Sequence, residues 1–118
     1  MKNTSILRII PIVLLMVGCA TTTHQTAQQS NAQSAIKSAE ELGAAQVPEA
    51  KLHLQLAREQ LIQANLLLKD GREERATWVL ARAEADANLA KILAREANLR
   101  ADAQRALDQV RQLQLQSR

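Results

Sequence analysis

Between Glu73 and Ala101 the chain reads EERATWVLARAEADANLAKILAREANLRA, with neither glycine nor proline. Small apolar residues recur in it at alternating intervals of four and three, the spacing of a helix that packs along one face. This face consists of Ala76, Leu80, Ala83, Ala87, Ala90, Ala94, Ala97 and Ala101. Glu73 and Glu74 favour a helix start, because acidic groups stabilise the N-terminal end of the helix dipole. We therefore predict one long, Ala-rich helix over residues 73–115.

Residues 48–69 are predicted to form a helix that packs against this one. Pro48 suits the first helical position, and Asp70-Gly71 interrupts the pattern after Lys69. The apolar face has the same spacing and consists of Ala50, Leu54, Ala57, Leu61, Ala64 and Leu68. Four further leucines widen that face, which predicts that this helix has two helical neighbours. These leucines are Leu52, Leu56, Leu66 and Leu67. Because the turn at Asp70-Gly71 is short, we expect an antiparallel hairpin.

A shorter helix is predicted over residues 30–42, where Ser30 and Gln33 form a capping box and Gly43 ends the pattern. At about 1.5 Å per residue, the helix over 73–115 is roughly twice as long as the helix over 48–69 and must project beyond it. We expect the first helix to lie antiparallel to the second, parallel to the third, and to cover part of that excess. A stripe then continues without an obvious cover: Leu99, Ala103, Ala106, Val110 and Leu113.

The composition agrees with an all-α chain and excludes several classes of protein. Of 118 residues, 47% are hydrophobic but only 1% are aromatic, with three glycines and two prolines. Such a chain lacks the aromatic core of a compact enzyme and the turn residues of a β-sandwich. The 15 basic and 12 acidic residues are interspersed, so we expect no nucleic-acid binding. The predicted fold is a short helix plus an antiparallel helical hairpin with a projecting C-terminal helix, in one domain over residues 30–118.

Residues 1–18 have the features of a bacterial export signal. Positive side chains accompany an apolar stretch over residues 9–17, which ends at Gly18-Cys19. A membrane span needs roughly 20 helical residues, so this stretch is short for an uncleaved anchor, which is the alternative interpretation. Cys19 is the sole cysteine, so no internal disulfide can form and the thiol needs another role.

The residues before Cys19 resemble the lipobox of bacterial lipoproteins, although Met16 and Val17 replace commoner residues of that pattern. The resemblance implies cleavage between Gly18 and Cys19, with a diacylglycerol group and an N-acyl chain attached to Cys19. Membrane lipid would then hold the protein. The same resemblance implies that Ala20 occupies the position that influences sorting and that it favours the outer membrane, with the protein on the periplasmic face.

Residues 20–29 are polar and lack apolar periodicity. We therefore interpret residues 19–29 as the lipidated cysteine followed by a flexible tether. A tether of this length would keep the helical domain within about 35 Å of the membrane surface.

No catalytic, metal or cofactor site is predicted. His24 and His53 are isolated from other ligands, whereas zinc sites use three or four, so we interpret His53 as a surface or boundary residue. The chain contains no phosphate-binding loop and no nucleophile motif. Trp78 either packs at the end of the hairpin or is an exposed contact for a partner, since tryptophan is enriched at binding hot spots.

Several short motifs lie between residues 35 and 99: Gly43-Ala44-Ala45, Pro48-Glu49-Ala50, Gly71, Leu80-Ala81 and Asp86-Ala87-Asn88-Leu89-Ala90. With them, the chain resembles small bacterial envelope lipoproteins that carry the helical domain of unknown function numbered 4398 (DUF4398). That family has no established activity, so the resemblance implies fold and location more than function. The chain is also similar, more weakly, to tetratricopeptide-type hairpins, which normally occur in arrays. Unlike the major murein lipoprotein it has no lysine among residues 116–118, so we expect no covalent peptidoglycan link.

Two functional hypotheses follow, and catalysis is disfavoured. The first is a non-enzymatic, lipid-anchored protein that faces the periplasm and acts as an envelope scaffold or adaptor. It would self-associate or bind a protein partner through the C-terminal helix, with these contact residues: Trp78, Leu99, Val110 and Leu113. The alternative is a regulatory binding module that holds or activates a specific envelope enzyme or transporter.

Overall fold

The computed structural model describes residues 20–117, which are almost entirely helical. α1 comprises Ala20–Glu41, η1 is a short 3-10 helix at Ala44–Gln46, α2 comprises Pro48–Lys69 and α3 comprises Glu73–Gln116. No strand occurs among these residues, so the predicted all-α class is confirmed. The predicted signal peptide and Cys19 lie outside the described residues.

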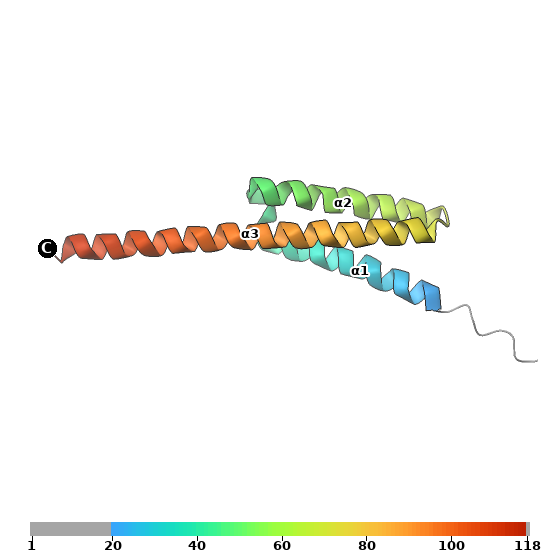
Figure 1. Cartoon of the computed structure of the whole chain (residues 1–118), viewed down its shortest axis with the longest axis horizontal. Coiled ribbons are helices and arrows are strands. Elements are labelled where there is room, and N and C mark those ends of the chain that lie inside the picture. Colours follow the sequence, from blue (N-terminus) through green and yellow to red (C-terminus); the bar gives the residue numbers. More distant parts are fainter. Residues whose placement is uncertain (1–19, 118) are drawn as a thin grey trace, which may run out of the picture.

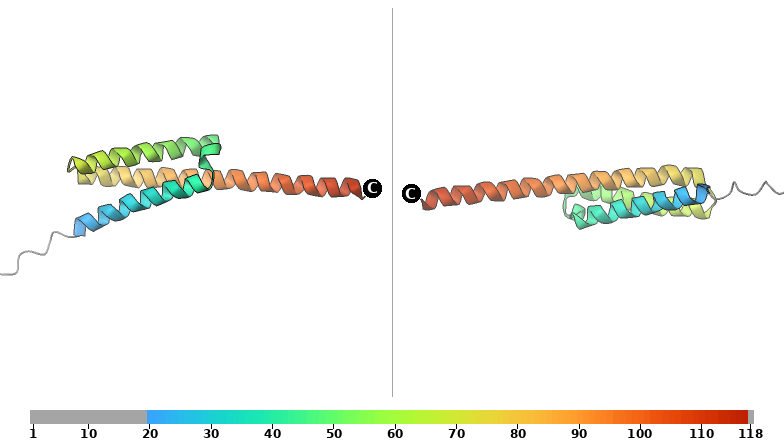
Figure 2. Two further views of the ribbon diagram at one scale, coloured as in Figure 1. Left: turned by 180° about the vertical axis from the view of Figure 1, so that it is seen from behind. Right: turned by 90° about the horizontal axis from the view of Figure 1, so that it is seen from below.

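The three α-helices are arranged around the N-terminal part of α3. In the view of Figure 1, α3 lies between α2 and α1, and it contacts both. α2 runs antiparallel to α3, whereas α1 runs antiparallel to α2 and parallel to α3, as predicted (Figure 2). The C-terminal part of α3 extends past both neighbours. The hairpin with a long projecting helix is therefore confirmed.

Glycines occupy both turns between the α-helices. At the end of α2, the Gly71 N–H donates to the Leu68 carbonyl (3.1 Å) and the Arg72 N–H donates to the Leu67 carbonyl (2.8 Å). This pair of bonds satisfies the last carbonyls of α2 while the chain reverses. Gly71 has φ 71° and Gly43 has φ 80°, values in the left-handed region that glycine adopts without steric cost. The helix breaks predicted at both glycines are thus confirmed.

α1 begins at Ala20, so the predicted flexible tether over residues 20–29 is wrong. The Gln29 side-chain amide donates to Asn65 Oδ1 of α2 at 2.8 Å, and Ala32 is fully buried against α2 and α3. Once these turns are packed, each further helical residue adds a hydrogen bond at little cost, and alanine and glutamine favour the helix. The polar residues 20–29 therefore belong to a helix and not to a tether.

The Ala-rich face of α3 forms the centre of the core. Six of its residues are fully buried, and we call them the inner seam: Ala76, Leu80, Ala83, Ala87, Ala90 and Ala94. Ala50, Leu54, Ala57 and Ala64 of α2 and Ala32, Ala35, Ile36 and Ala39 of α1 surround it. Because alanine ends at Cβ, the helix backbones approach closely and gain dispersion contacts along their whole shared length. Ala97 is only half-buried and Ala101 is exposed, since they lie where the neighbouring helices end.

α2 contacts both α3 and α1, so its two predicted helical neighbours are confirmed. Two finer predictions are wrong. Leu52 and Leu66, which were expected to widen the packed face of α2, face solvent. α1 does not cover the excess length of α3. The Asn98 side-chain amide donates to the Leu42 carbonyl at 3.0 Å, and every described residue after Asn98 is exposed. Because the chain reverses at the level of Leu42, α1 and α2 both pair with the same half of α3.

A polar cluster joins α2 to α3 beside the inner seam. Gln60 Nε2 donates to Asp86 Oδ2 at 2.8 Å, and His53 Nδ1 lies 3.0 Å from Asp86 Oδ1. Gln60 is buried, whereas His53 is partly exposed, so the prediction of a boundary histidine is confirmed. One carboxylate thus contacts two side chains that are a heptad apart on α2. A shift of α2 along α3 would break both contacts, so the cluster fixes the register of the hairpin.

Replacing Ala87 with leucine should overpack the inner seam, because the residue is fully buried where three helices meet. We expect the free energy of unfolding to fall by about 1–3 kcal/mol. The measurement is denaturant unfolding of a soluble version of the protein that begins at Ala20. Ala101→Leu, on the exposed continuation of the same face, is the matched control and should not change the midpoint. Equal midpoints for the two variants would contradict the packing of α3.

Replacing Asp86 with alanine should leave the buried amide of Gln60 without its acceptor. We expect a loss of about 1–3 kcal/mol, the desolvation cost of an unsatisfied polar group. Combining Asp86→Ala with Gln60→Leu should restore part of this stability, because the stranded amide is removed too. Glu59→Ala, at an exposed position of α2, is the control. A double variant no more stable than Asp86→Ala would show that the amide contact contributes nothing.

Candidate interaction surface

A second line of residues runs along α3 on the face opposite the inner seam. It begins two residues later, which rotates it by about 200° around the helix axis. Its spacing again alternates between four and three, here over five heptads. We call it the outer seam: Trp78, Arg82, Ala85, Leu89, Ile92, Glu96, Leu99, Ala103, Ala106, Val110 and Leu113. All eleven residues are exposed.

The outer seam presents large apolar side chains to solvent. Trp78 is 69% exposed, Ile92 58% and Leu99 62%. Only Arg82 and Glu96 interrupt the apolar line. Isolated exposed apolar residues are ordinary, whereas extended exposed apolar patches are typical of interaction sites. The arrangement can therefore bind the apolar face of another helix.

The structure brings together contact residues that the sequence indicated separately. The outer seam contains all four of them: Trp78, Leu99, Val110 and Leu113. The exposure of Trp78 shows that its interpretation as a packing residue at the end of the hairpin is wrong. The sequence reasoning missed Leu89 and Ile92, which connect Trp78 to the C-terminal stripe. Steps of seven residues from Trp78 lead to Ile92 and Leu99, and this spacing would have found the connection.

Residues 99–116, which we call the projecting end, extend about 27 Å beyond Asn98 as a single helix. Ion pairs at intervals of three or four residues brace this part of α3: Glu96–Arg100, Asp102–Arg105 and Asp108–Arg111. Each such pair contributes about 0.2–0.5 kcal/mol to an isolated helix. The charges of Asp108 and Arg111 lie off the outer seam, so its apolar residues remain uncovered.

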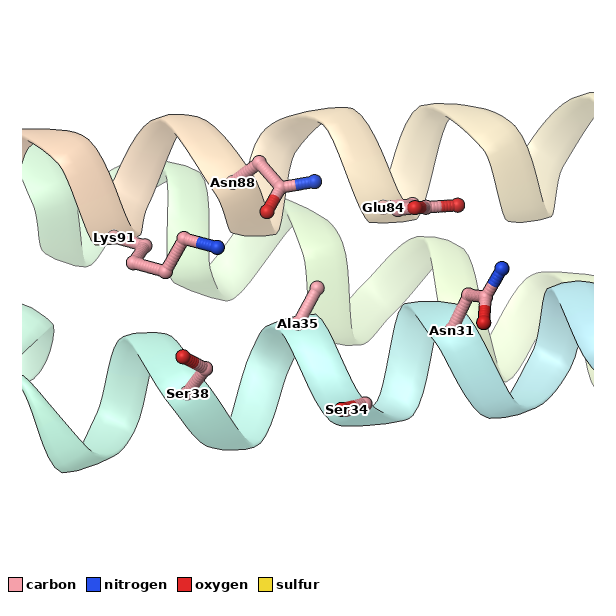
Figure 3. A pocket seen from close by; sticks show the side chains of 7 residues that line it. All are labelled: Asn31, Ser34, Ala35, Ser38, Glu84, Asn88 and Lys91. Carbon is pink, nitrogen blue, oxygen red and sulfur yellow. The ribbon is translucent and has the colours of Figure 1, made fainter.

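An open hollow of about 330 Å³ lies between α1 and α3. Its lining comprises Asn31, Ser34, Ala35 and Ser38 from α1 and Glu84, Asn88 and Lys91 from α3 (Figure 3). The hollow is a polar, open edge of the α1–α3 contact.

The remaining predicted features give little further geometry. Within residues 20–117, no group of three or more His, Cys, Asp or Glu side chains could hold a metal ion. No helix in that range combines the length and the hydropathy that a membrane span requires. Gly18 and the predicted lipidation site Cys19 lie outside the described residues, and Ala20 is the first residue of α1.

Comparison with known proteins identifies the family. The family described as Domain of unknown function (DUF4398) matches residues 27–106. Neither curated proteins nor solved structures give a match. The matched range covers most of α1, all of α2 and the part of α3 that carries the inner seam and most of the outer seam. The chain therefore belongs to the DUF4398 family.

Proposed function

We propose that the protein is a non-enzymatic, lipid-anchored scaffold or adaptor of the bacterial cell envelope, on the periplasmic face of the outer membrane. The observation that carries this proposal is the outer seam, an exposed apolar line that continues from the bundle onto the projecting end. A helix that needed only to fold would place polar residues on such a face. An uncovered heptad pattern is instead suited to holding another protein.

The anchor in this proposal is an acylated Cys19, as the resemblance of the preceding residues to a lipobox implies. α1 begins at Ala20, so its first turn would directly follow the acylated residue. Since α1 and α3 are parallel, the acylated residue would lie at the end of the molecule where α3 begins, and the projecting end at the other. The outer seam would thus run from the anchored end of the molecule to its far end, where a periplasmic partner can reach it.

A regulatory binding module remains the second candidate because of Trp78. Its side chain is exposed on the outer seam within the first turns of α3, close to the hairpin turn. Exposed tryptophan is a preferred anchor at protein interfaces. A specific enzyme or transporter bound there would be recovered as a defined heteromeric partner that depends on Trp78.

Replacing Cys19 with serine should prevent acylation and leave a full-length precursor with an intact signal peptide. Intact-mass measurement of the membrane fraction distinguishes this product from a processed, acylated chain that begins at Cys19. Ala20→Asp is a second variant, which should redirect the processed protein to the inner membrane if sorting follows the lipoprotein pattern. An unmodified Cys19 in the wild-type protein would contradict the anchor.

Ending the chain after Asn98 should remove partner recovery while the bundle stays folded. Both core clusters and the hydrogen bond to the Leu42 carbonyl involve residues of α3 up to Asn98, and the described residues after it are exposed, so the melting temperature should shift by no more than about a few degrees. Crosslinking in intact cells, followed by purification of the protein, measures the recovery of partners. If the truncated chain recovers the same crosslinked species as the full chain, the projecting end has no binding role, and the Trp78 region becomes the better candidate.

A further inference from the structure

The outer seam is self-complementary when two copies run in opposite directions. An antiparallel pair of helices brings each a position of a heptad opposite a d position of the other helix. If the two-fold axis passes between Ala97 and Asn98, every seam residue from Arg82 to Leu113 faces a seam residue of the second copy. Two residues face each other when they lie equally far from this axis along α3, on opposite sides of it. The seam therefore contains its own partner surface.

Side-chain size alternates across these layers. Leu89 faces Ala106 of the second copy, Ile92 faces Ala103, and Ala85 faces Val110, so these three kinds of layer each pair a large side chain with a small one. Facing large and small residues interdigitate without voids or overlap. In the parallel arrangement, each residue would face its own copy. Three layers would then contain only alanine pairs and leave cavities, formed by Ala85, Ala103 and Ala106.

Charge favours the same orientation. In a parallel pair, Glu96 would face Glu96 and Arg82 would face Arg82, which places like charges in the interface. In the antiparallel pair, Glu96 of one copy faces Leu99 of the second copy. Glu96 also keeps its ion pair with Arg100 of its own chain. Arg95 and Asp102 flank the seam, and the antiparallel register brings Arg95 of each copy next to Asp102 of the other. The two-fold axis creates two such contacts, and each places opposite charges side by side at the edge of the interface.

The neighbouring helices leave this surface accessible. α1 reaches α3 on the side of Glu84, Asn88 and Lys91, and α2 reaches it on the side of Asp86. Both sides flank the inner seam, so a second copy can approach the outer seam without displacing either helix. The projecting end of each copy would then lie along the bundle half of the other. In that arrangement, each copy covers the exposed outer-seam residues of the other, both along the bundle and along the projecting end.

The available area is sufficient for a specific contact. In this register the two copies of α3 overlap over residues 79–116, which is about 57 Å at 1.5 Å per residue, and a helix is about 10 Å wide. Two facing strips of this size bury roughly 1,100 Å² in total, above the approximately 1,000 Å² that a specific interface needs. We propose that the protein forms a homodimer through the outer seams of two antiparallel α3 helices. This inference rests on the proposed scaffold function, whose partner it names as a second copy of the chain.

Disulfide formation between single-cysteine variants of the full-length protein in membranes tests the orientation. Ile92→Cys and Ala103→Cys are co-expressed with different tags and mildly oxidised. A disulfide requires Cα atoms about 4.4–6.8 Å apart, which only facing layers provide. We expect a crosslinked dimer that contains both tags. Each variant expressed alone should remain uncrosslinked, since equivalent positions would lie about 16 Å apart along the axis. The unsubstituted chain controls for disulfides through Cys19.

Leu99→Asp and Leu115→Asp provide a matched pair for this crosslink. Leu99 lies on the outer seam, whereas Leu115 is similarly exposed, at 68%, on the opposite face of the projecting end. Leu99→Asp should lower the yield of the mixed dimer at least tenfold, and Leu115→Asp should leave it unchanged. Both side chains are exposed, so neither substitution disturbs the bundle. Equal yields for the two variants would overturn the proposal.

The other outcomes also decide the question. A crosslink formed by Ile92→Cys alone would show a parallel pair, and a crosslink to a different protein would show a heteromeric occupant, so either overturns the antiparallel homodimer. Fractionation of the same cells separates this result from the scaffold proposal. Membrane-bound protein without the mixed crosslink overturns the dimer and leaves the anchor standing. A mixed crosslink in protein that is not membrane-bound supports the dimer and contradicts the anchor.

Discussion

Close contact between helix backbones at the inner seam holds the bundle together. Five of the six seam residues are alanine, and burying one methyl-sized group contributes only about 0.8 kcal/mol. Stability therefore depends on many such contacts in an unbroken row, which requires straight, uninterrupted helices. This requirement explains why Gly43, Gly71 and Pro48 occur only at helix boundaries in the described part of the chain. The polar cluster around Asp86 complements the row, because alanines alone would allow one helix to slide along another.

α3 carries two heptad patterns with different compositions on opposite faces. The inner seam is nearly uniform and small, so it suits neighbours that must come very close. The outer seam mixes Trp, Leu, Ile and Val with alanine, so it suits a partner with a complementary sequence of sizes. The same helix thus separates the residues that fold the chain from those available for association. The projecting end carries only residues that are available for association.

The sequence predicts those parts of the fold that local features determine. Pro48 and Asp70-Gly71 mark the bounds of α2, and the alanine spacing marks the buried face of α3. The start of α1 could not be predicted, because residues 20–29 lack apolar periodicity and the contact between Gln29 and Asn65 is tertiary.

The surface assignments show the same division. Which leucines of α2 become exposed depends on where α1 lies, and that placement follows from the turn after Glu41 rather than from α2 itself. The burial of Gln60 depends on its partner on another helix. For Trp78 the spacing was present in the sequence, but its exposure depends on which face of α3 the two neighbours occupy.

The parallel course of α1 and α3 along the inner seam has a mechanical consequence. A chain held at Ala20 and pulled at the far end of α3 is loaded in shear along the α1–α3 contact, so many small contacts share the force and resist it together instead of separating one after another.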